Sequence, residues 1–239
     1  MPKKLSWLHL SDFHYSEKIA STWELSRGLF FNDINRLLEK EKVGPWDIVF
    51  FTGDLVGHGK KEEFDKLNDE LTILWDNLPP KSDGKKPILL CVPGNHDLKR
   101  PDEKMKKSAI YKAFKRWNED PDVSEIFWES DDNDYRGLVN DAFANYDDWL
   151  KSCRFLPPDG IVRGSIPGDF SYSTEINGIK LGVIGLNSAF LHLDDVELGE
   201  LALHGRQILR VAGDIDKFCA KHDINILLTN PSPRSMASQ

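Results

Sequence analysis

Residues 88–97, ILLCVPGNHD, join an apolar run to a turn that carries an amide, an imidazole and a carboxylate. The run at residues 88–92 is typical of a buried strand, because it is short, continuous and aliphatic. Asn95, His96 and Asp97 follow it almost directly. Open α/β sheets bind their ligands at the carboxyl ends of the strands. This stretch therefore indicates a buried strand that ends at a functional site.

The same arrangement occurs twice earlier in the chain. An apolar run at residues 5–10 precedes Asp12 and His14, and the run DIVFF at residues 47–51 precedes Asp54. In a parallel sheet the carboxyl ends of the strands lie at one edge. We therefore expect the polar side chains of the three turns to converge at one place.

Helix-like segments separate the three apolar runs. Residues 23–42 carry Leu and Ile at helical spacing, and residues 60–78 form a second amphipathic segment that stops at Pro79-Pro80. The order of strand, helix, strand, helix, strand predicts a parallel sheet and an α/β fold. Because the strands are apolar throughout, we expect helices to cover both faces of this sheet.

The pattern changes between residues 99 and 168. This stretch holds a basic segment, an acidic loop and an amphipathic helix, and it predicts an insertion or cap over the strand ends. The segments after it are a hairpin with an Asn-Gly turn, a helix and a last buried strand, at residues 170–186, 205–222 and 224–228. We expect a single domain over residues 1–239 with this insertion inside it.

Composition limits the classes of function. The chain has 239 residues, of which 40% are hydrophobic, so it can bury a substantial core. Its formal net charge of −8 disfavours binding of nucleic acid by bulk charge, although a local groove can still bind it. Cys91, Cys153 and Cys219 are widely spaced and form no CxxC pair, which indicates free thiols in a reducing compartment.

The sequence also bears on location. The first residues do not form a signal peptide, and no apolar stretch approaches the roughly 20 residues that a membrane span needs. We therefore expect a soluble, cytoplasmic protein with no membrane partner. The sequence does not define its oligomeric state.

Asp12, His14, Asp54 and Asn95 offer carboxylate, imidazole and amide donors, without thiolates. Such donors suit divalent Mn, Fe or Zn. They exceed the needs of one open catalytic site, but they suit part of a two-metal site in which a carboxylate bridges ions roughly 3.5–4 Å apart. The sequence therefore predicts a metal centre with oxygen and nitrogen ligands.

The motifs DxH, GD and GNHD, at residues 12–14, 53–54 and 94–97, resemble in this order those of the calcineurin-like metallophosphoesterases. Residues 53–63, GDLVGHGKKEE, are similar to the bacterial branch of that family that includes cyclic-nucleotide phosphodiesterases. Each motif is weak alone, but the ordered set is specific, and the resemblance covers nearly the whole chain. It implies an α/β sandwich with mostly parallel core strands flanked by helices, lacking its C-terminal strands.

The resemblance also implies a ligand set for two divalent ions. Asp12 and His14 would bind the first ion, and Asp54 would bridge both. Asn95 would bind the second ion through its amide oxygen.

Further roles follow from the resemblance for the turn after the third strand. His96 would lie near the phosphate and steady the leaving oxygen, and Asp97 would orient His96. The implied reaction is hydrolysis of a phosphodiester or phosphomonoester by a metal-activated hydroxide. Small phosphoesters, among them cyclic nucleotides, are the implied substrates, and the acidic charge disfavours a nuclease acting on DNA ends. His58 is close enough in sequence to Asp54 to reach a substrate, but a loop histidine without a chemical role is the plainer interpretation.

The chain departs from the family pattern after residues 224–229. The family places a histidine there, often within His-His-Pro, and later a Gly-His-x-His, whereas this chain continues NPSPRSMASQ. Three of the histidine ligands that the resemblance implies are missing. We therefore expect a truncated member that binds one ion or none and has weak or no phosphoesterase activity.

Several explanations fit this end of the chain. With plausible codons for residues 231–239, a frame moved by one base encodes His-His-Pro-Glu-Ala-Trp-Leu-His, so a reading-frame slip near Asn230 is one hypothesis. A deliberately shortened form and a naturally short homologue are others, and the intact gene can encode further domains. The rival function is a non-catalytic remnant or interaction module, against which two tightly held metal ions would argue.

Overall fold

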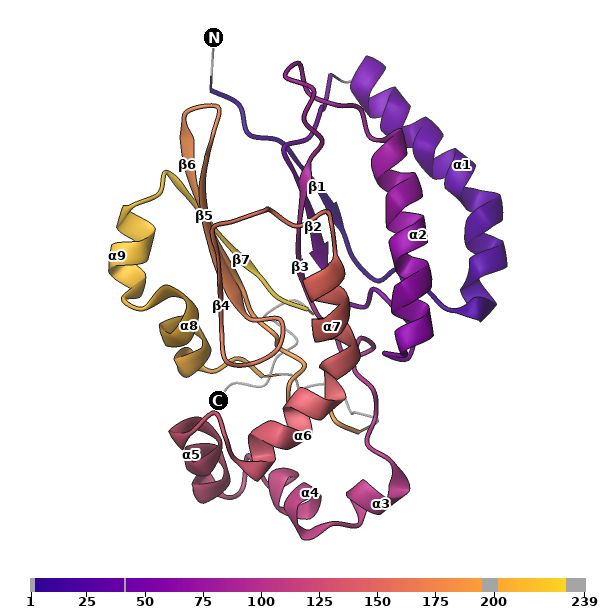
Figure 1. Cartoon of the computed structure of the whole chain (residues 1–239). Helices are drawn as coiled ribbons and strands as arrows, with labels where there is room; N and C mark the ends of the chain where they lie inside the picture. The colour runs from indigo at the N-terminus through magenta and orange to yellow at the C-terminus, as the bar shows by residue number, and fades with distance from the viewer. Residues whose placement is uncertain (1–2, 41, 195–201, 231–239) are drawn as a thin grey trace.

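Two sheets form the centre of the molecule in a computed structural model that describes residues 3–40, 42–194 and 202–230 (Figure 1). The first sheet consists of β1 (Trp7–Leu10), β2 (Ile48–Thr52) and β3 (Ile88–Val92), paired in parallel in that order. Helices α1 (Glu17–Glu39) and α2 (Lys61–Asn77) connect these strands. The order of elements predicted for this half of the chain is therefore confirmed.

The second sheet contains one parallel and two antiparallel pairs. Its strands, in spatial order, are β4 (Ile161–Arg163), β5 (Phe170–Ile176), β6 (Ile179–Gly185) and β7 (Ile224–Leu228). Strands β6 and β7 pair in parallel, whereas the others pair antiparallel. Asn177 and Gly178 join β5 to β6 with φ angles of 54° and 76°, the left-handed conformations of a type I′ hairpin turn. The predicted Asn-Gly hairpin is confirmed.

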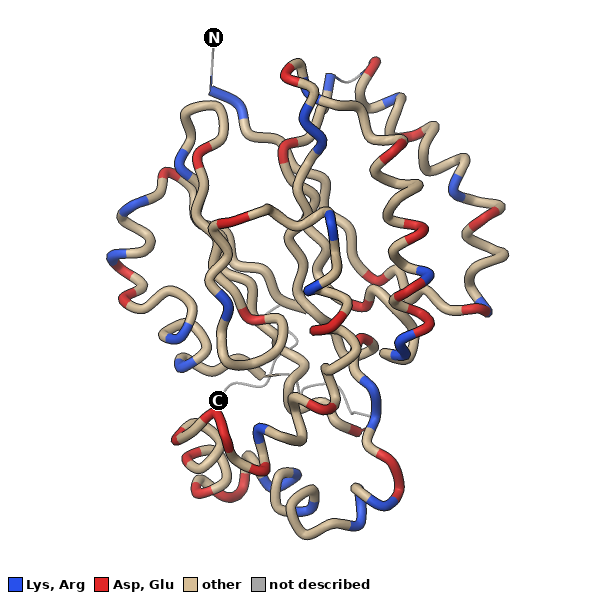
Figure 2. The backbone as a smooth tube through the Cα atoms, viewed as in Figure 1, with Lys and Arg blue, Asp and Glu red and all other residues tan. Residues whose placement is uncertain are grey.

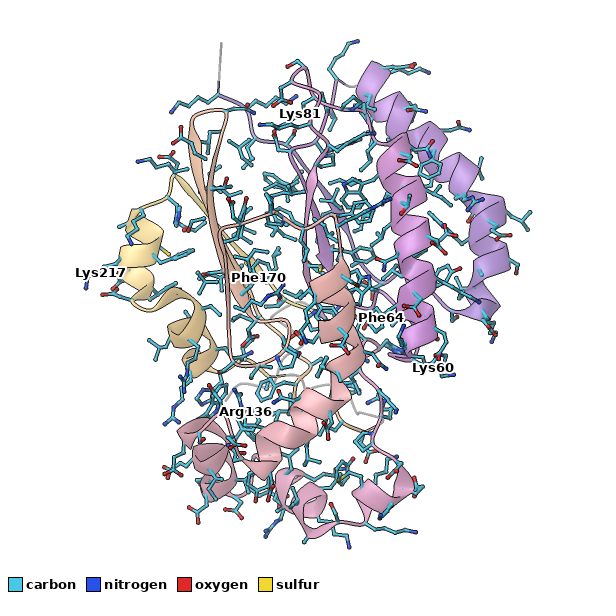
Figure 3. The ribbon with its side chains drawn as sticks, in the orientation of Figure 1. Lys60, Phe64, Lys81, Arg136, Phe170 and Lys217 are labelled. Carbon is cyan, nitrogen blue, oxygen red and sulfur yellow. The ribbon has the colours of Figure 1, made fainter. Side chains whose placement is uncertain are left out.

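The two sheets pack face to face, because successive side chains of a strand point to opposite sides. Phe50 of β2 lies in a buried cluster with Phe170 and Leu181 of the second sheet. Its neighbour Phe51 lies in another buried cluster, with Phe64 of α2; Figure 3 labels Phe64 and Phe170 in their separate layers. Helices therefore cover only one face of the parallel sheet, and the expectation of helices on both faces is wrong. The sequence of an apolar strand does not reveal whether a helix or a second sheet covers it, because either layer presents apolar side chains to the strand.

Helices α8 (Gly205–Ala212) and α9 (Ile215–Ala220) lie on the outer side of the second sheet (Figure 1). Ile184 of β6 packs there with Val211 of α8. One helix was predicted over residues 205–222, but it is interrupted at Gly213, whose φ is 64°. The layers run helices, sheet, sheet, helices, which is the α/β sandwich that the sequence predicted.

Residues 99–168 hold five short helices and β4. The helices are α3 (Glu103–Lys106), α4 (Ala109–Phe114), α5 (Pro121–Glu129), α6 (Asp134–Ala142) and α7 (Ala144–Ser152). Helices α3 to α6 gather at one end of the sandwich, and α7 leads back along the first sheet (Figure 1). Asn145 of α7 donates from Nδ2 to the carbonyl of Gly59 at 2.8 Å, so this part of the chain contacts the loop after β2.

Charged residues are spread along the helices and loops, whereas the strands in the middle of the molecule carry few of them (Figure 2). Arg136 lies on helix α6 but is buried, at 1% exposed. Its guanidinium donates to Asp131 Oδ1 at 2.8 Å and lies 4.7 Å from the centroid of the Phe127 ring. This buried cation ties α5 to α6.

None of the described helices is both long and apolar enough to cross a bilayer. The hypotheses about residues 231–239 concern a segment that lies outside the described residues.

Candidate metal centre

The turns after the three parallel strands bring three potential ligands together. One donor atom each from His14, Asp54 and His96 lies within 4.8 Å of the other two. His14 Nε2 is 3.7 Å from Asp54 Oδ2, and the rings of His14 and His96 are 4.5 Å apart between centroids. The predicted convergence at the carboxyl edge of the sheet therefore occurs.

Asp12 lies beside this cluster, with its Oδ1 3.8 Å from His14 Nε2. Its side chain is 61% exposed, so it lies on the open side. Backbone hydrogen bonds hold the turn in place: Asp12 N donates to Gly53 O at 3.2 Å, and His14 N donates to Asp54 O at 2.8 Å. The turn after β1 is thus fastened to the turn after β2.

Three of these residues have left-handed backbones that non-glycine residues rarely adopt. The φ angles are 56° at Asp12, 49° at His14 and 53° at Asp54. Such conformations cost of order 1–3 kcal/mol each and concentrate at functional sites. The surrounding contacts hold them, and the result is that all three side chains face one small space.

Gly94 is required by the close approach of Asp54. A Cβ atom at Gly94 would lie 2.2 Å from Asp54 Oδ1 and 2.6 Å from Asp54 N. Any side chain would therefore displace the carboxylate. The glycine of the GNHD motif lets the backbone of the third turn pass directly beside the carboxylate of the second.

His96 is oriented by the loop after β2. Its backbone N donates to Asp54 Oδ1 at 3.0 Å, and its ring Nδ1 lies 3.0 Å from the carbonyl of Gly57. A carbonyl only accepts, so Nδ1 carries the hydrogen and Nε2 of the neutral ring is left as a ligand or acceptor. The structure thus places His96 within the ligand cluster, whereas the sequence assigned it to the phosphate and leaving oxygen.

Asp97 is fully buried and binds backbone groups. Its Oδ1 accepts from Val56 N at 2.9 Å and its Oδ2 from Gly94 N at 2.8 Å. The expectation that Asp97 orients the His96 ring by a direct contact is therefore wrong. The ring is held by the carbonyl of Gly57, and the hydrogen bonds given above for the Asp97 carboxylate go to backbone groups. Asp97 instead fastens the turns after β2 and β3 to each other.

Burial raises the pKa of Asp54, and hydrogen bonding from His96 N and the charges of the two imidazoles oppose this effect. Among the ion pairs of the described residues, the partner of Asp54 is His14. Within the described residues, the buried Asp54 carboxylate has two imidazoles beside it and forms no ion pair with Lys or Arg. This arrangement fits a divalent cation, which would balance the charge of the carboxylate. The donor set contains no thiolate, as the sequence predicted.

Asn95 lies in the same turn and is half-buried. Its backbone carbonyl accepts from Arg100 Nη2 at 3.4 Å. Its role as a ligand through the amide oxygen stays a prediction, as do the assignments of Asp12 and His14 to one ion and of Asp54 as the bridge.

Asn230, the second residue after β7, lies at the site, and the sequence did not single it out as functional. It is 5% exposed, and its Nδ2 donates to Thr52 O at 2.6 Å. A Cβ atom at Gly94 would lie 2.8 Å from Asn230 Oδ1, so the amide oxygen faces the same space as Asp54 Oδ1. Its position after a buried strand was the available signal, because the other site residues follow strands in the same way.

The chain matches the model of a known protein family. A family model described as calcineurin-like phosphoesterase matches residues 5–163, which is more than half of the chain and contains all three turns. No curated protein matches the chain.

Proposed function

We propose, because this chain belongs to the calcineurin-like phosphoesterase family, that it hydrolyses a phosphoester at the His14, Asp54 and His96 cluster. The family is one of metal-dependent hydrolases of phosphoric esters. The observation that carries the proposal is the convergence of the three donor atoms within 4.8 Å at the carboxyl edge of the parallel sheet.

The residues that would hold the metal are His14, Asp54 and His96, with Asp12 on the open side and Asn95 as a further ligand. Divalent ions bound there would polarise phosphoryl oxygens and would make a bound water more acidic near neutral pH. Mn, Fe and Zn all suit this donor set.

Other residues of the chain hold the potential metal ligands in position. Asp97 holds the two turns at a fixed separation through Val56 N and Gly94 N. Gly57 O fixes the His96 ring so that Nε2 is available. Preorganised ligands of this kind require no rearrangement when the substrate arrives.

The substrates that we propose are small phosphodiesters or phosphomonoesters, with cyclic nucleotides among them. The net charge of −8 supports a small substrate over a nucleic acid, since bulk repulsion opposes a polyanion. We place the reaction in the cytoplasm, which is supported by the free thiols of Cys91, Cys153 and Cys219.

The test combines metal binding with turnover. The chain is titrated with Mn²⁺ by calorimetry, and hydrolysis of bis-p-nitrophenyl phosphate is followed by absorbance. We expect Mn²⁺ binding and slow nitrophenol release, both lost in Asp54→Ala and both kept in Asp76→Ala, an exposed carboxylate at the far end of α2. Weak or absent metal binding together with no turnover would favour the non-catalytic alternative.

A further inference from the structure

We propose that His58, oriented by Glu63, is a catalytic residue that donates a proton to the leaving oxygen of the phosphoester. This inference rests on the proposed function and adds a residue to the same site. It starts from a pair of side chains that the metal centre does not use.

The His58–Glu63 pair has the geometry of an oriented imidazole. His58 Nδ1 lies 2.9 Å from Glu63 Oε1, and His58 N donates to Glu63 Oε2 at 2.9 Å. The Glu63 side chain is 9% exposed, whereas that of His58 is 66% exposed. Because an ionised carboxylate only accepts, Nδ1 is the donor, and Nε2 on the far side of the ring is left for a solvent-borne partner.

The loop that carries His58 is fixed against the metal centre. Gly57 O accepts from His96 Nδ1 at 3.0 Å, and Gly57 N donates to Tyr15 O at 3.0 Å. His58 is the next residue, so its Cα lies about 3.8 Å from that of a residue in direct contact with His96.

The other side of the loop is equally constrained. A Cβ atom at Gly59 would lie 2.2 Å from the carbonyl carbon of Leu98, and Gly59 O accepts from Asn145 at 2.8 Å. The φ of Gly59 is 62°. Backbone packing on both sides therefore holds His58 at the rim of the site.

A capping role for Glu63 explains only part of this arrangement. Glu63 is the third residue of α2, and its Oε2 accepts from Lys60 N at 3.2 Å in a capping box; Figure 3 labels Lys60 at the start of the helix. The cap needs one carboxylate oxygen. It does not require the second oxygen to bind an exposed imidazole.

The proposed step balances as follows. A water attacks phosphorus, the bond from phosphorus to the leaving oxygen breaks with its electron pair on that oxygen, and the proton on His58 Nε2 moves to it. Solvent returns a proton to His58, and the attacking water loses one, so the products are an alcohol and a phosphate. The Glu63 carboxylate stabilises the protonated imidazole before transfer.

Two substitutions separate the chemistry from the hydrogen bond. His58→Asn keeps a donor near the Nδ1 position, and His58→Gln keeps one near the Nε2 position, but neither side chain transfers a proton. The substrates are methyl p-nitrophenyl phosphate, whose leaving group departs without protonation, and methyl phenyl phosphate, whose leaving group needs it.

We expect both variants to lose about 100-fold or more in kcat with the phenyl ester, the typical worth of general acid catalysis, and only a few-fold with the nitrophenyl ester. His222→Gln, at a histidine that contacts Ser173 rather than the residues of the site, should change neither rate. Equal losses on both esters, or no loss on either, would overturn the proposal.

A readout without turnover separates this inference from the proposed function. Nitrogen-15 NMR should show a hydrogen on His58 Nδ1, and the Nε2 resonance should shift when inorganic phosphate is added to the Zn²⁺-loaded chain. If the chain hydrolyses neither ester, the proposed function fails and this titration decides: a shifting Nε2 supports His58 as the phosphate-facing group, and a static one overturns it.

Discussion

At the scale of single residues, the site depends on backbone conformations that the amino-acid sequence does not reveal. Asp12, His14 and Asp54 all have positive φ, and Gly94 is the residue whose missing side chain leaves room for the Asp54 carboxylate. The motif letters identified the glycine and the ligand types. The neighbouring turns, through their backbone hydrogen bonds, set the directions in which the ligands point.

Asp169 provides a residue-scale test that is independent of the metal centre. Asp169 directly precedes β5 and is buried, and its Oδ1 accepts from Asn187 N at 2.7 Å and from Gln207 Nε2 at 3.1 Å. Burial raises its pKa to about 8, although hydrogen bonds from Asn187 and Gln207 act in the opposite direction. In an unfolded chain an aspartate has a pKa of about 3.9.

Because the folded pKa is raised, folded Asp169 keeps a proton between about pH 4 and 8 that the unfolded chain releases. Its contribution to the free energy of unfolding therefore falls with rising pH in that window, by about 1.4 kcal/mol per unit, and is constant above it. Asp169→Asn removes this titration. We expect the variant to gain stability relative to the original chain between pH 5 and 8 in urea unfolding, and parallel pH profiles would contradict the assignment.

At the scale of elements, helix lengths follow from sequence when a stop signal is strong. Residues 60–78 were predicted as a helix ending at Pro79-Pro80, and α2 ends at Asn77. The single helix predicted over residues 205–222 is two helices, because Gly213 takes a left-handed φ and Asp214 begins the next helix as its cap. A glycine within an amphipathic pattern does not reveal its φ, so this break was visible only in the fold.

Two glycines with open surroundings test the difference between helix interior and helix end. A Cβ atom at Gly28, inside α1, or at Gly213, after α8, would meet no atom within 4 Å. Gly28→Ala should therefore raise the free energy of unfolding by roughly 0.5–1 kcal/mol, because alanine restricts the unfolded chain more.

Gly213→Ala should lower the free energy of unfolding by about 1–2 kcal/mol, because its φ of 64° is strained for an L side chain. Both variants are compared by denaturant midpoints. Since neither has a steric neighbour, effects of the same sign would show that backbone conformation is not the cause.

At the scale of the whole molecule, the sandwich is held by side chains that alternate along β2. Phe50 packs with the second sheet, and Phe51 packs with the α2 layer. Both residues are nearly inaccessible, at 2% and 3% exposure. Each substitution to alanine should cost about 3–5 kcal/mol, the usual range for a buried phenylalanine.

The two variants should differ in where the structure loosens. In hydrogen exchange, Phe50→Ala should raise the rates most in β5 and β6, and Phe51→Ala should raise them most in α2. The same exchange pattern in both variants would mean that the two layers do not separate as the packing indicates.

The sequence by itself determined the parallel strands, the α2 helix, the Asn177-Gly178 hairpin and the kinds of donor at the strand ends. Each of these depends on local features, namely apolar periodicity, proline and glycine stops, and the side chains present in one turn. It also identified the family, since three short motifs in fixed order are specific even where each is weak.

Only the tertiary structure decided what covers each face of the first sheet, that Gly57 rather than Asp97 orients His96, and that Asn230 reaches the site from β7. These contacts join residues far apart in the chain. Their geometry depends on how complete layers pack, and on which buried donor finds which acceptor, so no local pattern contains it.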